Sequence, residues 1–229
     1  MSWDEAFSRR YDEWAAHMTA DVAFYVELAR GAGGPLAELA VGNGRVAIPV
    51  AQDTGQTVIG IDTSPAMLEQ ARARAAKAGV DLDLREGDMR DLDLDEPAAL
   101  IYCPFRALLH LPTWSDRRRT FERVAASLRP DGRFAWNAFA FDHAVAVRLD
   151  GAHLDDPVPH TIRYSVGDNR VDITLDDGAK SSLWWATKNE WLGLLDVAGL
   201  ELEALYGGFP REPFGDESRE YVFVARAAS

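Results

Sequence analysis

Between residues 36 and 139, short apolar runs alternate with longer segments of helical character. The apolar runs are predicted strands over 36–41, 57–61, 81–85, 98–103 and 133–139. The segments between them are predicted helices over 45–52, 65–77 and 113–128, the second with Ser64 as its N-cap and Pro65 as its first residue. Because parallel strands need such crossovers, this alternation predicts an α/β fold with a doubly wound, mostly parallel sheet and helices on both faces.

Different patterns flank this central region. At the N-terminus one helical face carries large apolar residues, and a second helix is predicted over 22–30; the residues of that face are Trp3, Phe7, Tyr11, Trp14 and Met18. Predicted strands over 160–165 and 170–174 flank a turn at 167–169, and a third over 181–186 indicates a small antiparallel insertion. A helix over 188–198 and strands over 200–206 and 221–227 follow.

These patterns predict four parts. Residues 1–33 form an N-terminal helical cap, and residues 34–150 form a Rossmann-like, cofactor-binding core. Residues 151–187 form an antiparallel lid on the acceptor side, and residues 188–229 complete the core sheet with a helix and a hairpin.

Charge and cysteine content narrow the expected partners. The chain has 24 basic and 37 acidic side chains, a formal charge of −13, which argues against nucleic acid as a partner. The one dense basic cluster, Arg117 to Arg119, is interpreted as a solvated helix face. A single cysteine, Cys103, and the lack of a signal-like or membrane-spanning stretch predict a cytoplasmic protein without a membrane partner, as a monomer or homodimer.

Candidate ligand-binding residues follow the predicted strands, where open α/β sheets bind ligands. Gly42 and Gly44 follow the first strand, and Asp62 follows the second, where an acid can accept hydrogen bonds from both ribose hydroxyls. Asp88 and Met89 follow the third strand and suit an adenine ring, and a Cys103-Pro-Phe105 turn follows the fourth. The spacing predicts a nucleoside cofactor.

Two kinds of nucleoside cofactor compete for this site. Residues 42–47, Gly-Asn-Gly-Arg-Val-Ala, fit the G-x-G-x-x-G/A fingerprint of dinucleotide-binding proteins. Glu38 argues against a dinucleotide, because a carboxylate near the glycine turn repels a pyrophosphate and tolerates a cationic sulfonium.

Taken together, these motifs resemble those of class I S-adenosylmethionine-dependent methyltransferases of the small-molecule type. The resemblance rests on Glu38 to Gly44, Asp62, the Gly87-Asp88-Met89 segment and the Leu128-Arg-Pro-Asp-Gly132 segment, and it spans about residues 7–227. It implies a seven-stranded sheet of order 3-2-1-4-5-7-6 with strand 7 antiparallel. One departure is Ala40, which stands where the family has the first glycine of the turn.

The resemblance also implies the cofactor, S-adenosyl-L-methionine, and roles for individual residues. Gly42 and Gly44 flank the methionyl part, Asp62 holds the ribose, and Asp88 and Met89 hold the adenine. Arg45 is expected to pair with the methionine carboxylate or with Glu38. The full set of expected cofactor-binding residues is Tyr11, Glu38, Ala40, Gly42, Asn43, Gly44, Arg45, Asp62, Thr63, Met67, Asp88, Met89, Cys103 and Phe105.

The acceptor is expected between the strand ends and the insertion. Trp14, Arg106, His110 and Trp184 are the candidate acceptor-binding residues, and His110 and Tyr11 are the candidate catalytic residues. The insertion is acidic and aromatic, which suits an amine or a neutral ring compound. The sequence has no Cys/His ligand cluster, and we predict no metal.

The expected function is methyl transfer to nitrogen or oxygen of a small molecule by in-line displacement. The alternatives are an NAD(P)-dependent oxidoreductase and a non-catalytic cofactor-binding module.

Overall fold

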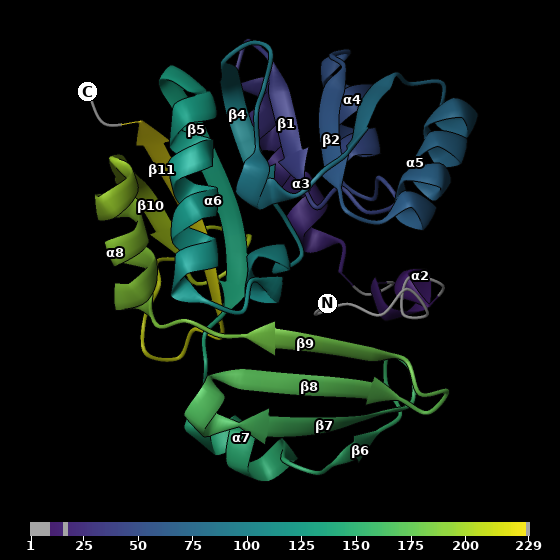
Figure 1. Ribbon diagram of the computed structural model, residues 1–229, viewed down its shortest axis with the longest axis vertical. Helices are drawn as coiled ribbons and strands as arrows, with labels where there is room; N and C mark the ends of the chain where they lie inside the picture. The colour runs from purple at the N-terminus through teal and green to yellow at the C-terminus, as the bar shows by residue number, and fades with distance from the viewer. Residues whose placement is uncertain (1–9, 16–17, 228–229) are drawn as a thin grey trace.

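A mixed seven-stranded sheet forms the centre of the computed structural model, which describes residues 10–15 and 18–227 (Figure 1). The strands are β1 (Leu36–Leu39), β2 (Val58–Asp62), β3 (Leu82–Glu86), β4 (Ala98–Cys103), β5 (Leu128–Phe139), β10 (Leu200–Tyr206) and β11 (Glu220–Ala227). Their order is β10-β11-β5-β4-β1-β2-β3, with β1 to β5 parallel and β11 antiparallel to both of its neighbours. With β10 and β11 counted as strands 6 and 7, the predicted order is confirmed.

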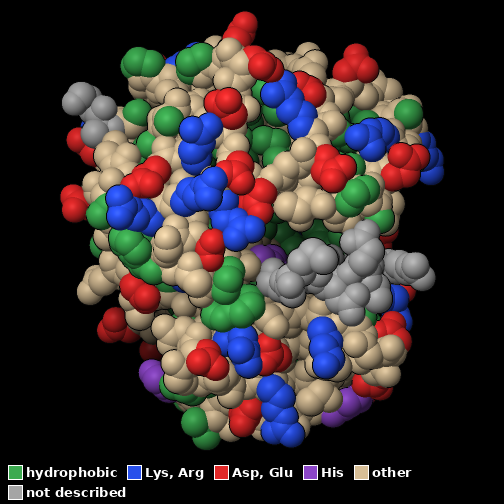
Figure 2. Space-filling model, viewed as in Figure 1, with side chains coloured by type: hydrophobic (Ala, Val, Ile, Leu, Met, Phe, Trp, Pro, Cys, Tyr) green, Lys and Arg blue, Asp and Glu red, His purple; other side chains and the backbone are tan. Residues whose placement is uncertain are grey.

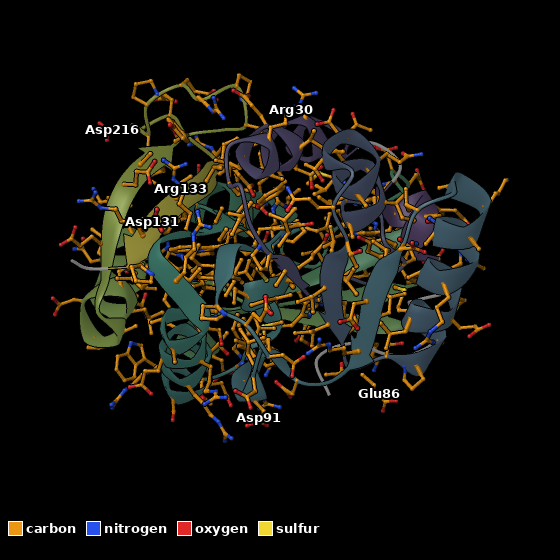
Figure 3. All side chains as sticks on the ribbon, turned by 90° about the horizontal axis from the view of Figure 1, so that it is seen from above. Arg30, Glu86, Asp91, Asp131, Arg133 and Asp216 are labelled. Carbon is orange, nitrogen blue, oxygen red and sulfur yellow. The ribbon has the colours of Figure 1, made fainter. Side chains whose placement is uncertain are left out.

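Helices cover both faces of this sheet. One apolar cluster joins it to α3 (Ala20–Arg30), α4 (Ala47–Thr54) and α5 (Pro65–Ala78), and the other joins it to α6 (Trp114–Ser127) and α8 (Lys188–Ala198). Every residue of β1 and β4 is buried, because both faces of these central strands are covered. Seen from above, the exposed charges of Arg30, Glu86 and Asp91 lie at the periphery (Figure 3).

Several predicted boundaries are confirmed, and others move. Ser64 caps α5 by accepting from the Met67 N–H at 3.2 Å, with Pro65 first in the helix. The predicted helix over 45–52 begins later, at Ala47. The turn predicted at 130–132 lies inside β5 as an irregularity, where the partner of β4 shifts from Leu128 to Arg133.

The predicted insertion is a separate antiparallel sheet of order β6-β7-β8-β9. Its strands are β6 (His153–Leu154), β7 (His160–Ser165), β8 (Arg170–Leu175) and β9 (Lys180–Trp184), one more than expected. A helix that the sequence analysis missed, α7 (His143–Leu149), precedes it, capped by Asp142. In Figure 1 this sheet lies beyond the end of the core sheet toward which β1 and β4 point, where ligands bind in open α/β sheets.

A short helix, α2 (Tyr11–Ala15), lies between the two sheets (Figure 1). Of the predicted N-terminal face, Trp3 and Phe7 fall outside the described residues, whereas Tyr11, Trp14 and Met18 are described. Within the described part of the chain, no helix is long and apolar enough to cross a lipid bilayer.

Candidate cofactor and acceptor site

The turn after β1 has three residues with positive φ. Ala40 (54°), Gly42 (53°) and Gly44 (80°) adopt the left-handed region that favours glycine. A side chain at Gly44 would also meet Ile48, since its Cβ would lie 3.0 Å from the Ile48 Cδ1. The backbone therefore turns sharply, and Gly42 and Gly44 place no side chain where a ligand could approach it.

Asp62, at the end of β2, holds this turn in place. Its Oδ2 accepts from the Gly42 N–H at 2.8 Å, and its Oδ1 accepts from the Ser64 N–H at 2.9 Å. A carboxylate has about four lone-pair sites, so the same oxygens can also accept from sugar hydroxyls. Thr63 beside it is exposed, whereas Met67 is buried in the first turn of α5.

Two buried acceptors flank the turn. Glu38 in β1 is 2% exposed, and burial raises the pKa of its carboxyl well above the ordinary value, against the opposing effects of Tyr102 and Arg45. Its Oε2 and the Oδ1 of Asn43 have no hydrogen-bond partner among the described residues. Buried acceptors of this kind need a donor, and a ligand ammonium group fits that need.

Arg45 is bound to Asp21 of α3 and not to Glu38. Its two terminal nitrogens donate to the Asp21 carboxylate at 2.8 and 2.5 Å, and it also donates to the Met18 carbonyl at 2.6 Å. Burial opposes its charge, but the bonds to Asp21 prevail and raise its pKa. The predicted pairing with Glu38 is therefore wrong.

Tyr11 and Phe105 meet next to Arg45. The Phe105 ring lies edge-on to Tyr11 at 5.3 Å between centroids, and the Arg45 guanidinium carbon lies 4.9 Å from the Phe105 centroid. The Tyr11 hydroxyl accepts a long hydrogen bond of 3.4 Å from the Arg45 Nε. Burial raises the pKa of Tyr11, so this phenol is protonated at neutral pH.

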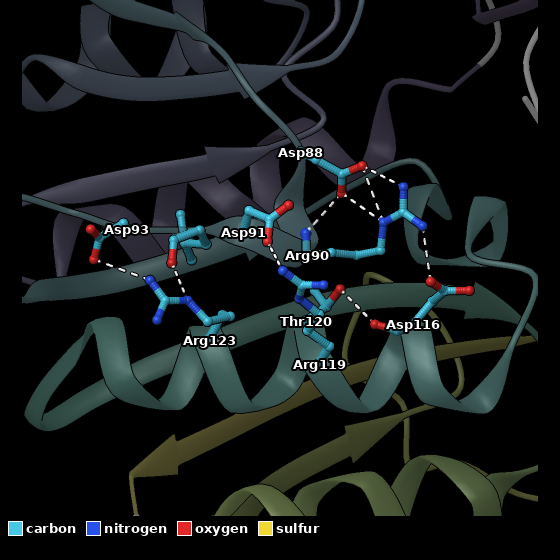
Figure 4. Close-up of polar contacts among 9 residues, drawn as sticks. Asp88, Arg90, Asp91, Asp93, Asp116, Arg119, Thr120 and Arg123 are labelled. Carbon is cyan, nitrogen blue, oxygen red and sulfur yellow. Dashed lines mark hydrogen bonds and ion pairs between the residues drawn. The ribbon is translucent and has the colours of Figure 1, made fainter.

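The segment predicted to hold adenine is fixed by ion pairs. Asp88 caps the short 3₁₀ helix η1 (Met89–Asp91) and accepts from the Arg90 guanidinium at 2.6 to 3.1 Å, which lowers the pKa of Asp88. Figure 4 shows Arg90 between Asp88 and Asp116, while Arg119 and Arg123 of α6 reach Asp91 and Asp93. The Asp88 carboxylate is thus already engaged, and its adenine contact stays a prediction.

Cys103 ends β4 and is fully buried, which raises the pKa of its thiol. The next residues, Phe105 and Arg106, both have left-handed backbones, with φ of 57° and 61°. Asn137 of β5 and Glu220 of β11 hold this turn, with Asn137 Oδ1 accepting from the Arg106 N–H at 3.3 Å. Neither Asn137 nor Glu220 was predicted as a site residue from the sequence.

A cavity of about 280 Å³ lies between the core, α2 and the insertion. The core lines it with Phe105, Arg106 and His110, the N-terminal region with Trp14 and Met18, and the insertion with Asp156, Pro157, Ile173, Ser181 and Leu183. Three of the four predicted acceptor residues line this cavity, and Trp184 lies outside the lining set. Phe105, predicted to contact the cofactor, lies beside the glycine turn and also lines this cavity.

His110 is the lining group whose pKa is displaced most clearly. Burial lowers its pKa to about 4, against a smaller effect of the Ser182 backbone. Its imidazole is therefore neutral at physiological pH, and a neutral imidazole can accept a proton.

The two tryptophans at the end of β9 attach the insertion to the core. Trp185 stacks on Phe141 with 3.9 Å between centroids, and the Trp184 carbonyl accepts from Arg117. Arg117 is only 5% exposed and lies over Trp191 of α8, so the interpretation of Arg117 as solvated is wrong.

The sheet order, together with the glycine turn after β1 and the acid at the end of β2, matches the Rossmann-like fold of methyltransferases. A family model described as a methyltransferase domain matches residues 36–132.

Two curated relatives match longer segments of the chain than this family model does. The 27-O-demethylrifamycin SV methyltransferase of Amycolatopsis mediterranei (strain S699) is 31% identical over 139 residues, 60% of this chain and 49% of the relative. The dTDP-3-amino-3,6-dideoxy-alpha-D-glucopyranose N,N-dimethyltransferase of Streptomyces fradiae is 34% identical over 113 residues, 49% of this chain and 42% of the relative. The chain thus spans about half the length of these curated relatives.

The solved structure of the CcbJ methyltransferase from Streptomyces caelestis is 26% identical, with a TM-score of 0.76 over 92% of this chain and 90% of that chain. Residues 36–132 are thus similar to a methyltransferase domain, and the fold as a whole is similar to that of a solved methyltransferase. This result favours the methyltransferase hypothesis over the nicotinamide-dependent alternative.

Proposed function

We propose that this protein is an enzyme that transfers the methyl group of S-adenosylmethionine to nitrogen or oxygen of a small molecule. The observation that carries the proposal is the position of Phe105, which contacts Tyr11 and Arg45 beside the glycine turn and also lines the cavity. A single ring therefore separates the cofactor region from a space that can hold an acceptor. The relatives named for a rifamycin derivative and for an amino sugar support a small-molecule acceptor.

The residues beside the glycine turn suit this cofactor. Glu38 and Asn43 offer buried oxygens without partners among the described residues, which fit the methionyl ammonium group. Asp62 is the candidate ribose neighbour, since a carboxylate can accept several hydrogen bonds at once, and Met89 and Asp88 are the candidate adenine neighbours. The bound cofactor supplies a methyl group that is already activated by its sulfonium sulfur.

For in-line displacement the protein contributes mainly alignment, which is worth up to about 7–11 kcal/mol of the barrier. We assign this alignment to the cavity walls, with Trp14 and Arg106 among the acceptor contacts. His110 is the candidate proton acceptor, because its imidazole is neutral above about pH 4. Tyr11, a protonated phenol beside the cofactor region, is proposed to orient the reacting groups. A cytoplasmic location, a monomeric or homodimeric state and the absence of nucleic-acid and membrane partners stay predictions.

The first test is calorimetric titration with S-adenosylhomocysteine. Asp62→Ala should weaken binding by about 1–3 kcal/mol, because ribose hydroxyls and the turn lose their acceptor. Asp53→Ala, which removes an acid from an exposed ion pair with Arg30, is the matched control and should leave the affinity unchanged. Equal affinity of wild type and Asp62→Ala would contradict the assigned site.

Turnover is tested separately, since binding alone also fits a non-catalytic module. Cell extract incubated with the protein and methyl-labelled cofactor should yield a labelled small molecule detectable by mass spectrometry. Tight cofactor binding without any labelled product, in extract and across a broad acceptor panel, would favour the binding module.

A further inference from the structure

Arg106, at the wall of the acceptor cavity, is neutralised by an acid from the far end of the chain. The Glu220 carboxylate at the start of β11 accepts from the Arg106 Nε at 3.1 Å to each oxygen, and from Nη2 at 2.6 Å. The Glu220 side chain is only 13% exposed. In this fork-like geometry the two charges bind with fixed orientation.

Asn137, fully buried in β5, holds both partners of this pair. Its amide nitrogen donates to Glu220 Oε1 at 2.6 Å. Its amide oxygen accepts from the Arg106 N–H at 3.3 Å and from the buried Tyr25 hydroxyl at 3.2 Å. One amide therefore fixes the backbone of Arg106 and the carboxylate that meets its side chain.

The backbone at this point needs such support. Phe105 and Arg106 are consecutive residues other than glycine in the left-handed region, a conformation that persists only where neighbouring contacts hold it. It directs the Arg106 guanidinium to within 5.7 Å of the Phe139 ring centroid, beside Glu220. The network thus determines where the only lining arginine among the described residues is placed.

The charges of the cavity lining follow from this arrangement. Of its three titratable lining groups, His110 is neutral above about pH 4, Arg106 is matched by Glu220, and Asp156 adds a carboxylate. The described lining therefore carries no net positive charge. Without Glu220, the cation of Arg106 would face the cavity uncompensated.

We infer that Glu220, held by Asn137, sets the charge of the acceptor cavity and makes it select neutral or cationic acceptors over anionic ones. Glu220 acts through Arg106 and is a positioning residue. The inference rests on the proposal that this cavity receives the acceptor.

Three probes of similar size test it: benzylamine, benzyl alcohol and benzoate, titrated against the protein saturated with S-adenosylhomocysteine and followed by ligand-observed NMR. The wild type should bind benzylamine and benzyl alcohol more tightly than benzoate. Glu220→Gln should improve benzoate binding relative to benzylamine by about tenfold, the effect of one unit charge at intermediate dielectric. Arg106→Gln alone should shift the ranking the other way, toward benzylamine, because it removes the cation and leaves the Glu220 carboxylate uncompensated.

Controls separate this effect from a loss of structure. Glu201→Gln removes the acid of the Arg226 pair near the opposite end of β11 and should leave the probe ranking unchanged. Glu220→Asp keeps the charge and should retain the wild-type ranking. An unchanged ranking in Glu220→Gln, or no probe bound in this cavity, overturns the inference while the cofactor proposal stands. If the wild type did not bind S-adenosylhomocysteine, the proposed function itself would be overturned.

Discussion

At the scale of single residues, Ala40 departs from the methyltransferase motif that the chain resembles. The structure gives it a φ of 54°, so the turn keeps the conformation that glycine would adopt. An L-residue other than glycine costs about 1–2 kcal/mol in this region. The chain therefore tolerates strain at the turn that Asp62 holds from the other side.

Ala40→Gly should raise the free energy of unfolding by about 0.5–1 kcal/mol, because it relieves this strain. The gain is smaller than the strain itself, since glycine also increases the backbone entropy of the unfolded chain. Urea denaturation measures the effect. Ala73→Gly, in the exposed middle of α5, should lower the same quantity by about 1 kcal/mol. Destabilisation by both substitutions would contradict the strain at Ala40.

His110 should make stability depend on pH. Its pKa of about 4 in the folded protein lies below the ordinary 6.5, so the unfolded chain binds more protons between these values. The contribution is present above pH 6.5 and is lost as the pH falls toward 4, with a slope of at most about 1.4 kcal/mol per pH unit. His110→Gln should flatten this part of the pH dependence in denaturant titrations at pH 4.5 and 7.

The same group predicts the pH profile of the reaction. If His110 accepts the proton, kcat/KM should show its inflection near pH 4 and none near 6.5. An inflection near 6.5 that disappears in His110→Gln would show that the imidazole is better solvated than its burial implies.

At the scale of elements, α2 joins three parts of the molecule. Asp12 accepts from Asn43 of the glycine turn at 2.9 Å and pairs with Arg74 of α5. Trp14 lies edge-on to His160 of β7, with 4.9 Å between ring centroids. A helix of five residues has little stability alone, so these contacts place it.

Trp14→Ala should raise the KM for the acceptor about tenfold, because it removes one apolar wall of the cavity and a contact with the insertion. The affinity for S-adenosylhomocysteine should change little, since Trp14 lies on the acceptor side. Steady-state kinetics and calorimetry measure the two effects. Trp114→Ala, on the exposed surface of α6, is the matched control, and an equal rise in KM there would contradict the assignment.

The sequence predicted most of the sheet because helices cover both faces and its central strands are continuous apolar runs. It missed α7 and β6, which have only seven and two residues and no sustained periodicity. It also began β5 only after a Pro-Asp-Gly segment that is a turn in most contexts, although the structure starts the strand at Leu128, before this segment.

The site was partly predictable for a similar reason. Glu38, Gly42 and Asp62 stand at strand ends, and the ends of parallel strands converge by topology alone. The partners of Arg45 and Arg106 were not predictable, because Glu220 lies 114 residues from Arg106 in the chain. Such pairs depend on side-chain geometry that local spacing does not encode.

At the scale of the whole molecule, the excess of acid is distributed rather than concentrated. Figure 2 shows Asp and Glu side chains mixed with Lys and Arg over one face, and many arginines there and elsewhere bind carboxylates. Exposed pairs of this kind contribute little stability each, about 0–1 kcal/mol. Stability therefore rests on the two apolar layers that enclose the sheet.

The insertion leaves and rejoins the core at one place, where Phe141 and Trp185 stack. The insertion can therefore change in length and sequence without altering the core sheet. Longer or shorter hairpins between β7 and β9 would reshape one wall of the cavity, while β1 and β2 keep their register. The glycine turn is thus built into the part of the molecule that such changes would break, and one wall of the cavity into the part that can vary without breaking it.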